Sequence, residues 1–433
     1  MNYYSTRDRE RAHGCSLREA AMMGLAPDGG LFVPERIPQA DMALAERLAG
    51  ESYAALAGYL AGLFFGGDFD SQAVQRELDG LYDFPVPLRV VGRGRYTLEL
   101  FHGPTCAFKD FGAGFMGRMT GLLGAADEKL VILTATSGDT GSAVAHGFHN
   151  VPGVEVVVLY PEGKISRLQE CQMTALGGNI HPLRVAGTFD DCQRLVKELF
   201  ADAPFRKRRR VTSANSINLL RWIPQAFYYF YAYAQLKRAG KAANAVICVP
   251  SGNFGNITAG LFGKKMGLPI KRFIAANNRN DIFYQYLQTG KYNPRPSIAT
   301  IANAMDVGDP SNFARVIDLY GNSHAAISAE ISGTTYTDEQ IRETVKETWK
   351  EHHYLLDPHG ACGYRALVEG LKEGETGVFL ETAHPAKFLE TVESIIGESV
   401  EIPAKLQEFM KGEKKSLQMT KEFADFKNYL LSL

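Results

Sequence analysis

The sequence predicts an α/β protein, with helices on the faces of parallel twisted sheets and a mainly helical N-terminal region. From Lys129 onward, short apolar segments rich in β-branched residues alternate with segments of helical pattern. This alternation is typical of parallel strands joined by helices. Residues 1–90 lack it and instead hold two helix-like segments, 16–25 and 41–64. The 43 glycines suit loops in which the backbone approaches a ligand closely.

The expected strands and helices follow one another along the chain. The strands are 129–137, 154–161, 179–187, 211–215, 244–252, 270–278 and 377–385. The helices are 141–150, 165–178, 189–202, 219–240, 256–267 and 386–397. A chain of 433 residues exceeds what one hydrophobic core usually supports. We therefore expect a mainly helical subdomain at 1–90 and two α/β subdomains at 91–240 and 241–433, the last with an insertion near 291–338.

Charge and composition argue against several classes of protein. The 47 Lys and Arg and 48 Asp and Glu give a net charge of −1, whereas proteins of nucleic acids or membrane surfaces are usually basic. No apolar run suits a membrane span, and the N-terminus lacks the apolar core of a secretory signal. The six cysteines form no C-x-x-C pair, which favours reduced thiols in the cytoplasm. His146 and His149 lack an obvious third ligand, so no metal site is predicted.

Two loops in the first half of the chain carry residue types suited to catalysis. In residues 101–112, Lys109 stands among phenylalanines. Apolar surroundings lower the pKa of a lysine, which can then act as a base or form a Schiff base near neutral pH. A surface lysine beside a helix start is the simpler interpretation of this loop alone. In residues 136–141, Ser137, Asp139 and Thr140 open a helix and would either face an anion or merely cap the helix.

Three later segments suit phosphate or a ring nitrogen. Residues 250–256 hold two glycines, and their N–H groups can form an anion nest or simply a structural turn. The Thr382 hydroxyl, at a strand end, can bond a buried ring nitrogen or cap the next helix. In residues 211–221, Asn215 and Ser216 precede a helix start, and Arg221 would add a charge-assisted contact to a second phosphate. The alternative is that Asn218 caps this helix and Arg221 lies on its surface.

Taken together, the loops resemble the pyridoxal-phosphate enzymes of fold type II, the tryptophan synthase β family. Within it, FHGPTCAFKDFG, ATSGDTG, PSGNFGN and TAHPAKF, with the N-terminal SLREAAMMGLAPDGGLFVPE, resemble the threonine synthases that lack a long regulatory extension. The resemblance runs over nearly the whole chain. Cys106 departs from the aliphatic residue usual there. Asp139 stands where many relatives have Asn facing the cofactor's phenolic oxygen, which a carboxylate would repel.

This resemblance implies a cofactor and a role for each site residue. The cofactor is pyridoxal 5'-phosphate, and Lys109 is the lysine that holds it and the catalytic base. Its phosphate loop is Gly252, Asn253, Phe254, Gly255 and Asn256. Thr382 is the partner of the pyridine nitrogen. The residues implied to bind substrate are Ser137, Thr140, Asn215, Ser216 and Arg221.

The implied activity is that of a cytoplasmic lyase, monomeric or homodimeric, in the last step of threonine biosynthesis. It converts O-phospho-L-homoserine and water to L-threonine and phosphate by γ-elimination and β-addition of water. One alternative is a phospholyase on the same scaffold, which would release a keto acid, ammonia and phosphate. Another is a non-catalytic protein that senses an amino-acid phosphate and needs no cofactor-holding lysine. Neither a nucleic acid nor a membrane is expected as a partner.

Overall fold

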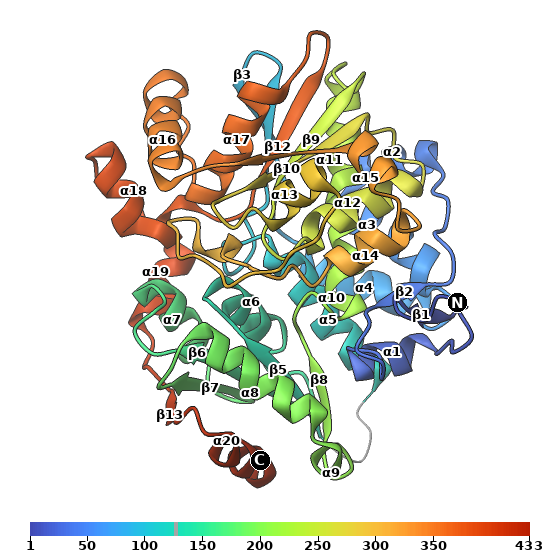
Figure 1. The fold of residues 1–433 in the computed structure, drawn as a ribbon, viewed down its shortest axis with the longest axis vertical. Helices are drawn as coiled ribbons and strands as arrows, with labels where there is room; N and C mark the ends of the chain where they lie inside the picture. The colour runs from blue at the N-terminus through green and yellow to red at the C-terminus, as the bar shows by residue number, and fades with distance from the viewer. Residues whose placement is uncertain (125–128) are drawn as a thin grey trace.

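The computed structural model describes residues 1–124 and 129–433, which form two large open sheets (Figure 1). The strands of the sheet in the upper half of Figure 1 are β3 (Leu88–Gly92), β4 (Arg95–Glu99), β9 (Ala245–Pro250), β10 (Arg272–Asn277), β11 (Ile331–Thr335) and β12 (Thr376–Glu381). They lie in the order β11-β10-β9-β12-β4-β3. All neighbours are parallel except β3, which is antiparallel to β4.

The second sheet, in the lower half of Figure 1, is parallel throughout. Its strands are β5 (Leu130–Ala135), β6 (Val154–Pro161), β7 (Ile180–Val185), β8 (Arg210–Ser213) and β13 (Leu417–Met419). They lie in the order β13-β7-β6-β5-β8. Both faces of β5 are buried, which explains why its sequence is apolar except for Thr134. The prediction of parallel sheets flanked by helices is confirmed.

Helices cover both faces of the second sheet. Val131 and Leu133 pack in one apolar cluster with α8 and α20, whereas Ile132 on the opposite face packs in a cluster with α5, α6 and α7. The helices associated with this half are α5 (Lys109–Leu123), α6 (Asp139–Gly147), α7 (Arg167–Thr174), α8 (Phe189–Ala201), α9 (Ala203–Arg206), α19 (Ala404–Lys411) and α20 (Phe423–Ser432).

The six-stranded sheet is covered in the same way. Cys248 and Phe379 on one face pack with α16 and α17, and Ile247 and Val378 on the other pack with α11 and α12. The helices of this half are α10 (Leu219–Trp222), η1 (Ile223–Ala226), α11 (Phe227–Arg238), α12 (Gly255–Lys265), α13 (Ile282–Thr289), η2 (Asn303–Met305), α14 (Phe313–Leu319), α15 (His324–Glu330), α16 (Asp338–His352), α17 (Pro358–Gly370), η3 (Pro385–Phe388) and α18 (Leu389–Ile396).

The N-terminal region is mainly helical, as predicted. It contains α1 (Leu17–Met23), α2 (Met42–Glu51), α3 (Tyr53–Phe65), α4 (Ser71–Leu81) and a two-stranded antiparallel sheet of β1 (Tyr3–Ser5) and β2 (Phe32–Pro34). The apolar side chains of α3 join the core that also contains α5 and α11. Within the part of the chain that the structure describes, no helix is both long and apolar enough to cross a membrane.

Three of the expected helices are divided, which corrects the prediction; one of them, 386–397, forms η3 and then α18. The segment 41–64 forms α2 and α3, because Ser52 has extended backbone and its hydroxyl accepts a hydrogen bond from the Ala55 N–H at the start of the second helix. The segment 219–240 forms α10, η1 and α11. Pro224 has no N–H to donate to an α-helical ladder, and the chain around it takes the tighter 3₁₀ form.

Each of the two sheets contains strands from distant parts of the sequence. Strand β4 belongs to the predicted 91–240 subdomain, yet it pairs with β12 in the six-stranded sheet. Strand β13, near the C-terminus, pairs with β7 in the other sheet. Strand β11 lies inside 291–338 and forms an edge of the six-stranded sheet beside β10. The division at residues 90 and 240 and the insertion stay predictions.

Helices α5 and α6 cross at two glycines that allow their backbones to touch. A Cβ on Gly117 would lie 2.0 Å from the Gly147 carbonyl oxygen, and one on Gly147 would lie 2.8 Å from the Ala113 backbone. Because these neighbours are backbone atoms, they cannot rotate away as a side chain would. The close crossing fixes the relative position of Lys109 and Asp139, the first residues of the two helices.

We expect Gly117→Ala to lower the free energy of unfolding by about 1–3 kcal/mol, as overpacking of a core does. Gly121→Ala in the same helix is the control, because a Cβ there meets nothing closer than 3.9 Å. It should leave stability unchanged or raise it by up to about 1 kcal/mol through helix propensity. Urea unfolding of both variants measures the difference. Equal midpoints for the two would contradict the close crossing.

Candidate active site

A cavity of about 350 Å³ lies where loops of the two sheets meet. The loops that follow β5, β8, β9 and β12 line it, together with the start of α5 and residues 303–309. This is the carboxyl edge of the strands, where α/β enzymes bind ligands. The residues predicted from the sequence that lie at its wall are Lys109, Ser137, Thr140, Asn215, Ser216, Arg221, Gly252, Asn253, Phe254, Gly255, Asn256 and Thr382.

Lys109 begins α5, and its side chain is only 16% exposed. The amine lies 3.9 Å from Asp139 Oδ2 and 4.9 Å from the centre of the Phe108 ring. Burial lowers the pKa of Lys109, and the charges of Lys387 and Arg221 lower it further, against the opposing effect of Asp139. A lowered pKa leaves more of the amine unprotonated at neutral pH, which suits a base or nucleophile.

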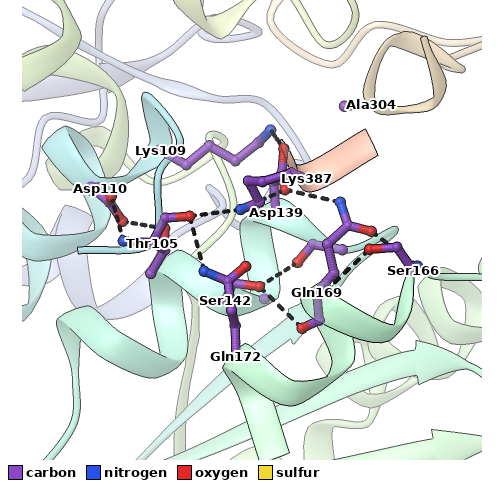
Figure 2. A network of polar contacts seen from close by, with 12 residues as sticks. Thr105, Lys109, Asp110, Asp139, Ser142, Ser166, Gln169, Gln172, Ala304 and Lys387 are labelled. Carbon is purple, nitrogen blue, oxygen red and sulfur yellow. Dashed lines mark hydrogen bonds and ion pairs between the residues drawn. The ribbon is translucent and has the colours of Figure 1, made fainter. Parts of the chain in front are cut away.

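A second buried lysine, Lys387, shares Asp139 with Lys109 (Figure 2). Its amine lies 2.8 Å from Asp139 Oδ1 and donates to the Thr105 carbonyl at 2.8 Å. Gln169 donates to the same Asp139 oxygen at 2.9 Å. Burial opposes ionisation of Asp139, but Lys387 and Lys109 outweigh it and hold the pKa of this carboxyl well below its ordinary value. Asp139 is therefore a fixed, compensated negative charge.

Glycine at position 138 is required for this network. Its φ of 136° is one that other residues rarely adopt. A Cβ there would lie 2.4–2.6 Å from the amide group of Gln169. The absence of a side chain at position 138 lets Gln169 reach Asp139. This contact joins the start of α6 to α7 beside the cavity.

The loop after β9 combines a strained turn with free polar groups. Phe254 takes a left-handed conformation, with φ 62°, lies at the cavity wall, and packs its ring against Phe283 in the core. No side chain caps the start of α12. Asn256 Oδ1 accepts hydrogen bonds from Tyr228 and Tyr229, whereas its buried Nδ2 has no partner among the described residues. Uncapped helix N–H groups and an unpaired amide donor suit an anion.

Hydrogen bonds from neighbouring side chains and backbone groups hold the loop 250–256 and the nearby residues 215–216 in place. Asn253 Nδ2 donates to Ser216 Oγ at 3.0 Å, and its Oδ1 accepts from the Ser311 N–H at 2.7 Å. Asn312 also donates to Ser216 Oγ, at 2.9 Å. Asn215 Oδ1 accepts from the Thr134 hydroxyl at 3.1 Å. Asn215 is therefore held within the five-stranded half, whereas Ser216 is held by hydrogen bonds from the other half of the molecule.

Arg221 is a buried cation that bonds backbone carbonyls. Its Nε donates to the Ala214 carbonyl at 2.8 Å and its Nη1 to the Lys109 carbonyl at 3.1 Å. No carboxylate among the described residues forms an ion pair with it, and burial lowers its pKa to about 10. Asn218 does cap α10, by accepting from the Leu220 N–H. Since α10 has only four residues, the guanidinium and not a helix dipole supplies the positive charge.

The comparisons with known proteins agree along the whole chain. A family model described as pyridoxal-phosphate dependent enzyme matches residues 96–382. Models of the N-terminal and C-terminal regions of threonine synthases match 2–82 and 360–430. A threonine synthase of Haemophilus influenzae is 42% identical over all of both chains. The chain belongs to the threonine synthase family.

Solved threonine synthases have the same fold. The crystal structure of the Escherichia coli threonine synthase covers all of both chains with a TM-score of 0.92 and 41% identity. A threonine synthase of Brucella melitensis, solved with pyridoxal phosphate bound, covers 99% of this chain and 98% of its own, with a TM-score of 0.92 and 34% identity. The cofactor of this family is pyridoxal phosphate, and the fold is type II.

The cavity fits this cofactor. The uncapped start of α12 and the unpaired Asn256 amide offer donors to a phosphate, and the partly buried amine of Lys109 offers an attachment point. The Thr382 side chain lies at the wall, while its carbonyl accepts from the Phe108 N–H and ties this loop to α5. A Cβ on Gly252 would lie 2.8 Å from the Met305 backbone, so glycine keeps that side of the cradle open.

Several residues at the site carry no local signal in the sequence. Lys387 lies in the TAHPAKF motif and Gln169 in the predicted helix 165–178, and neither segment indicates a contact with Asp139. Both meet Asp139 only through the fold. His359 also reaches the wall, held by Asp357 and by the Ala304 N–H at 3.1 Å. Asp139, whose carboxylate would repel the cofactor's phenolic oxygen, is paired with Lys387.

We expect Gly255→Val to weaken the binding of pyridoxal phosphate by about tenfold or more, a loss of about 1.4 kcal/mol. A Cβ at 255 already lies 3.1 Å from Ser216 Cβ, and a branched side chain would displace the loop. Gly263→Ala, in the same helix with no contact closer than 3.4 Å, is the control. Titration of the cofactor-free chain by absorbance measures both. Unchanged affinity in a folded Gly255→Val variant would contradict the loop assignment.

Proposed function

We propose that this chain converts O-phospho-L-homoserine and water to L-threonine and phosphate with pyridoxal phosphate as cofactor. The observation that supports it most directly is a buried amine with two separate anion sites beside it: the loop 252–256 and Arg221. Two sites are needed because the cofactor and the substrate each carry a phosphate. When bound, the cofactor stabilises negative charge on the substrate carbons.

Lys109 is the base that moves protons. It takes the proton from substrate Cα and then one from Cβ, and it returns protons as water adds. A single group can serve several transfers only if its pKa lies near the working pH. The burial that lowers the pKa of Lys109 provides this property. The Phe108 ring and the start of α5 fix the direction of the amine.

Arg221 binds the substrate phosphate, together with Ser137, Thr140, Asn215 and Ser216. Its guanidinium is buried and bonded only to carbonyls, so it keeps positive charge for an anion. Charge grows on the phosphate as its bond to Cγ breaks, and a fixed donor gains strength during that step. Thr382, at the cavity wall, would donate its hydroxyl to the pyridine nitrogen of the bound cofactor. A neutral partner enforces ring protonation less than a carboxylate would.

The alternative, a phospholyase, would use the same residues but would not add water at Cβ. The threonine synthases at about 42% identity over the full chain favour threonine synthesis. The deciding experiment gives O-phospho-L-homoserine to the purified chain and assays L-threonine and phosphate together. Equal amounts of both are expected. Phosphate with a keto acid and ammonia, but without threonine, would establish the alternative.

We also propose a cytoplasmic enzyme, monomeric or homodimeric, with neither nucleic acid nor membrane as partner. The six cysteines, all within the described ranges, are free thiols, which supports a reducing compartment. The net charge of −1 gives no general attraction to polyanions.

We expect Lys109→Ala to lower turnover by about 10²–10⁴-fold or more, because it removes the base. Borohydride reduction should then leave no cofactor on the peptide that contains position 109, whereas the unaltered chain retains it there. Peptide mass spectrometry provides the readout. Cofactor recovered on another lysine of the unaltered chain would overturn the assignment of Lys109.

We expect Arg221→Ala to lower kcat/KM for O-phospho-L-homoserine by about 2–4 kcal/mol, the scale of one preorganised donor. Inorganic phosphate should inhibit the variant less strongly than the unaltered enzyme. Cofactor affinity should barely change, since the loop 252–256 is intact. A loss of less than about twofold in kcat/KM would place Arg221 outside the substrate site.

A further inference from the structure

The amines of Lys109 and Lys387 lie at different distances from Asp139. Asp139 is one negative charge between two lysine amines, and all three side chains are largely or fully buried (Figure 2). Lys387 Nζ is within hydrogen-bond distance of Asp139, at 2.8 Å, whereas Lys109 Nζ stays at 3.9 Å. The close partner of the Asp139 carboxylate is therefore Lys387 and not Lys109, the first residue of α5.

Lys387 is held in place more firmly than a surface lysine would be. Its side chain is completely buried, and the amine also donates to the Thr105 carbonyl. Lys387 belongs to η3 and meets the Oδ1 atom of Asp139, whereas Lys109 lies nearer Oδ2 (Figure 2). Gln169 fixes the same carboxylate oxygen from α7. The carboxylate is thus tied on the side away from the Lys109 amine.

We propose that Lys387 is a positioning residue for Lys109: it binds Asp139 closely and so prevents this carboxylate from forming a tight ion pair with the reactive amine. Without Lys387, Asp139 would be a buried charge whose nearest cation is Lys109. A buried carboxylate that loses its partner attracts the remaining one strongly. Lys109 would then keep its proton to a higher pH and would be a poorer base and nucleophile.

Other charged groups face these residues and stay in place in the test. Arg221 and Asp357 act on Lys109, the first lowering and the second raising its pKa. Asp110, His384 and Cys106 lie within electrostatic range of Lys387. Because these groups are common to all the variants below, differences between variants report on the Asp139–Lys387 pair.

The inference rests on the proposed role of Lys109, so the experiment reads the amine directly and not the reaction. The full-length chain, freed of cofactor, is treated with acetic anhydride at a series of pH values. Acetylation at Lys109 is quantified by peptide mass spectrometry. The pH of half-maximal labelling is compared for the unaltered chain, Lys387→Met, Asp139→Asn and the double variant. The labelling works whether or not the chain makes threonine.

Lys387→Met should raise the labelling midpoint of Lys109 by about 1 pH unit or more, the scale of one nearby opposite charge. Asp139→Asn should lower the midpoint, since Lys387 is then an uncompensated cation near Lys109. The double variant should fall between these two, because both charges are gone. In the holoenzyme, the acid limb of the kcat/KM profile should move to higher pH in Lys387→Met.

Lys405→Met is the matched control. Lys405 donates to the carbonyls of His102 and Gly103, in the same loop as the Thr105 carbonyl that Lys387 bonds, but it forms no hydrogen bond or ion pair with Asp139 among the described residues. This variant should leave the Lys109 midpoint unchanged. An unchanged midpoint in a folded Lys387→Met variant would overturn the proposal, as would a double variant that labels like Lys387→Met. If Lys387→Met does not fold, Lys387→Gln, which also removes the charge that binds Asp139 but keeps a polar side chain, must raise the midpoint instead, and an unchanged midpoint in that variant would overturn the proposal.

Discussion

Removing Lys109 from water while keeping its amine able to lose a proton is the constraint on which the rest of the site depends. Burial alone favours the neutral amine, but a carboxylate 3.9 Å away favours the charged one. The balance between the two is set by what else touches that carboxylate. In this chain the balancing groups come from α7 and η3, far apart in the sequence. The protonation of one lysine is therefore a property of the packed molecule.

The framework that fixes these charges is a set of close backbone approaches. Helices α5 and α6 touch at Gly117 and Gly147, which sets the separation of Lys109 and Asp139 at the helix starts. Gly112 plays the same part for Arg221, since a Cβ there would lie 2.3 Å from the Arg221 carbonyl and 2.6 Å from its guanidinium. Rigid helices placed by backbone contact vary less in position than loops do, so the charges keep their distances.

Local patterns in the sequence predicted the strands of both sheets from β5 to β10, and the loops at their carboxyl ends, because both are encoded within short stretches. The order of the strands within each sheet is not encoded in short stretches of sequence. Strands β4 and β12 are neighbours although their paired residues Glu99 and Glu381 are 282 positions apart, a pairing that no periodicity records. Lys387 illustrates the same limit for the site. The sequence contains its motif, but its partner Asp139 follows a strand of the other sheet. The helix break at Ser52 likewise depends on a local hydrogen bond, that of the Ser52 hydroxyl.

The two anion sites differ in chemistry in a way that suits their proposed ligands. The loop 252–256 offers backbone N–H groups and a neutral amide, donors suited to a phosphate that stays bound. Arg221 offers a full charge, and nearby Arg315 is likewise buried and bonded to carbonyls, including that of Ser216. Neither guanidinium has a carboxylate partner among the described residues. A departing phosphate gains charge as its bond breaks, so the cations belong on its side, and neutral donors are sufficient for the phosphate that does not react.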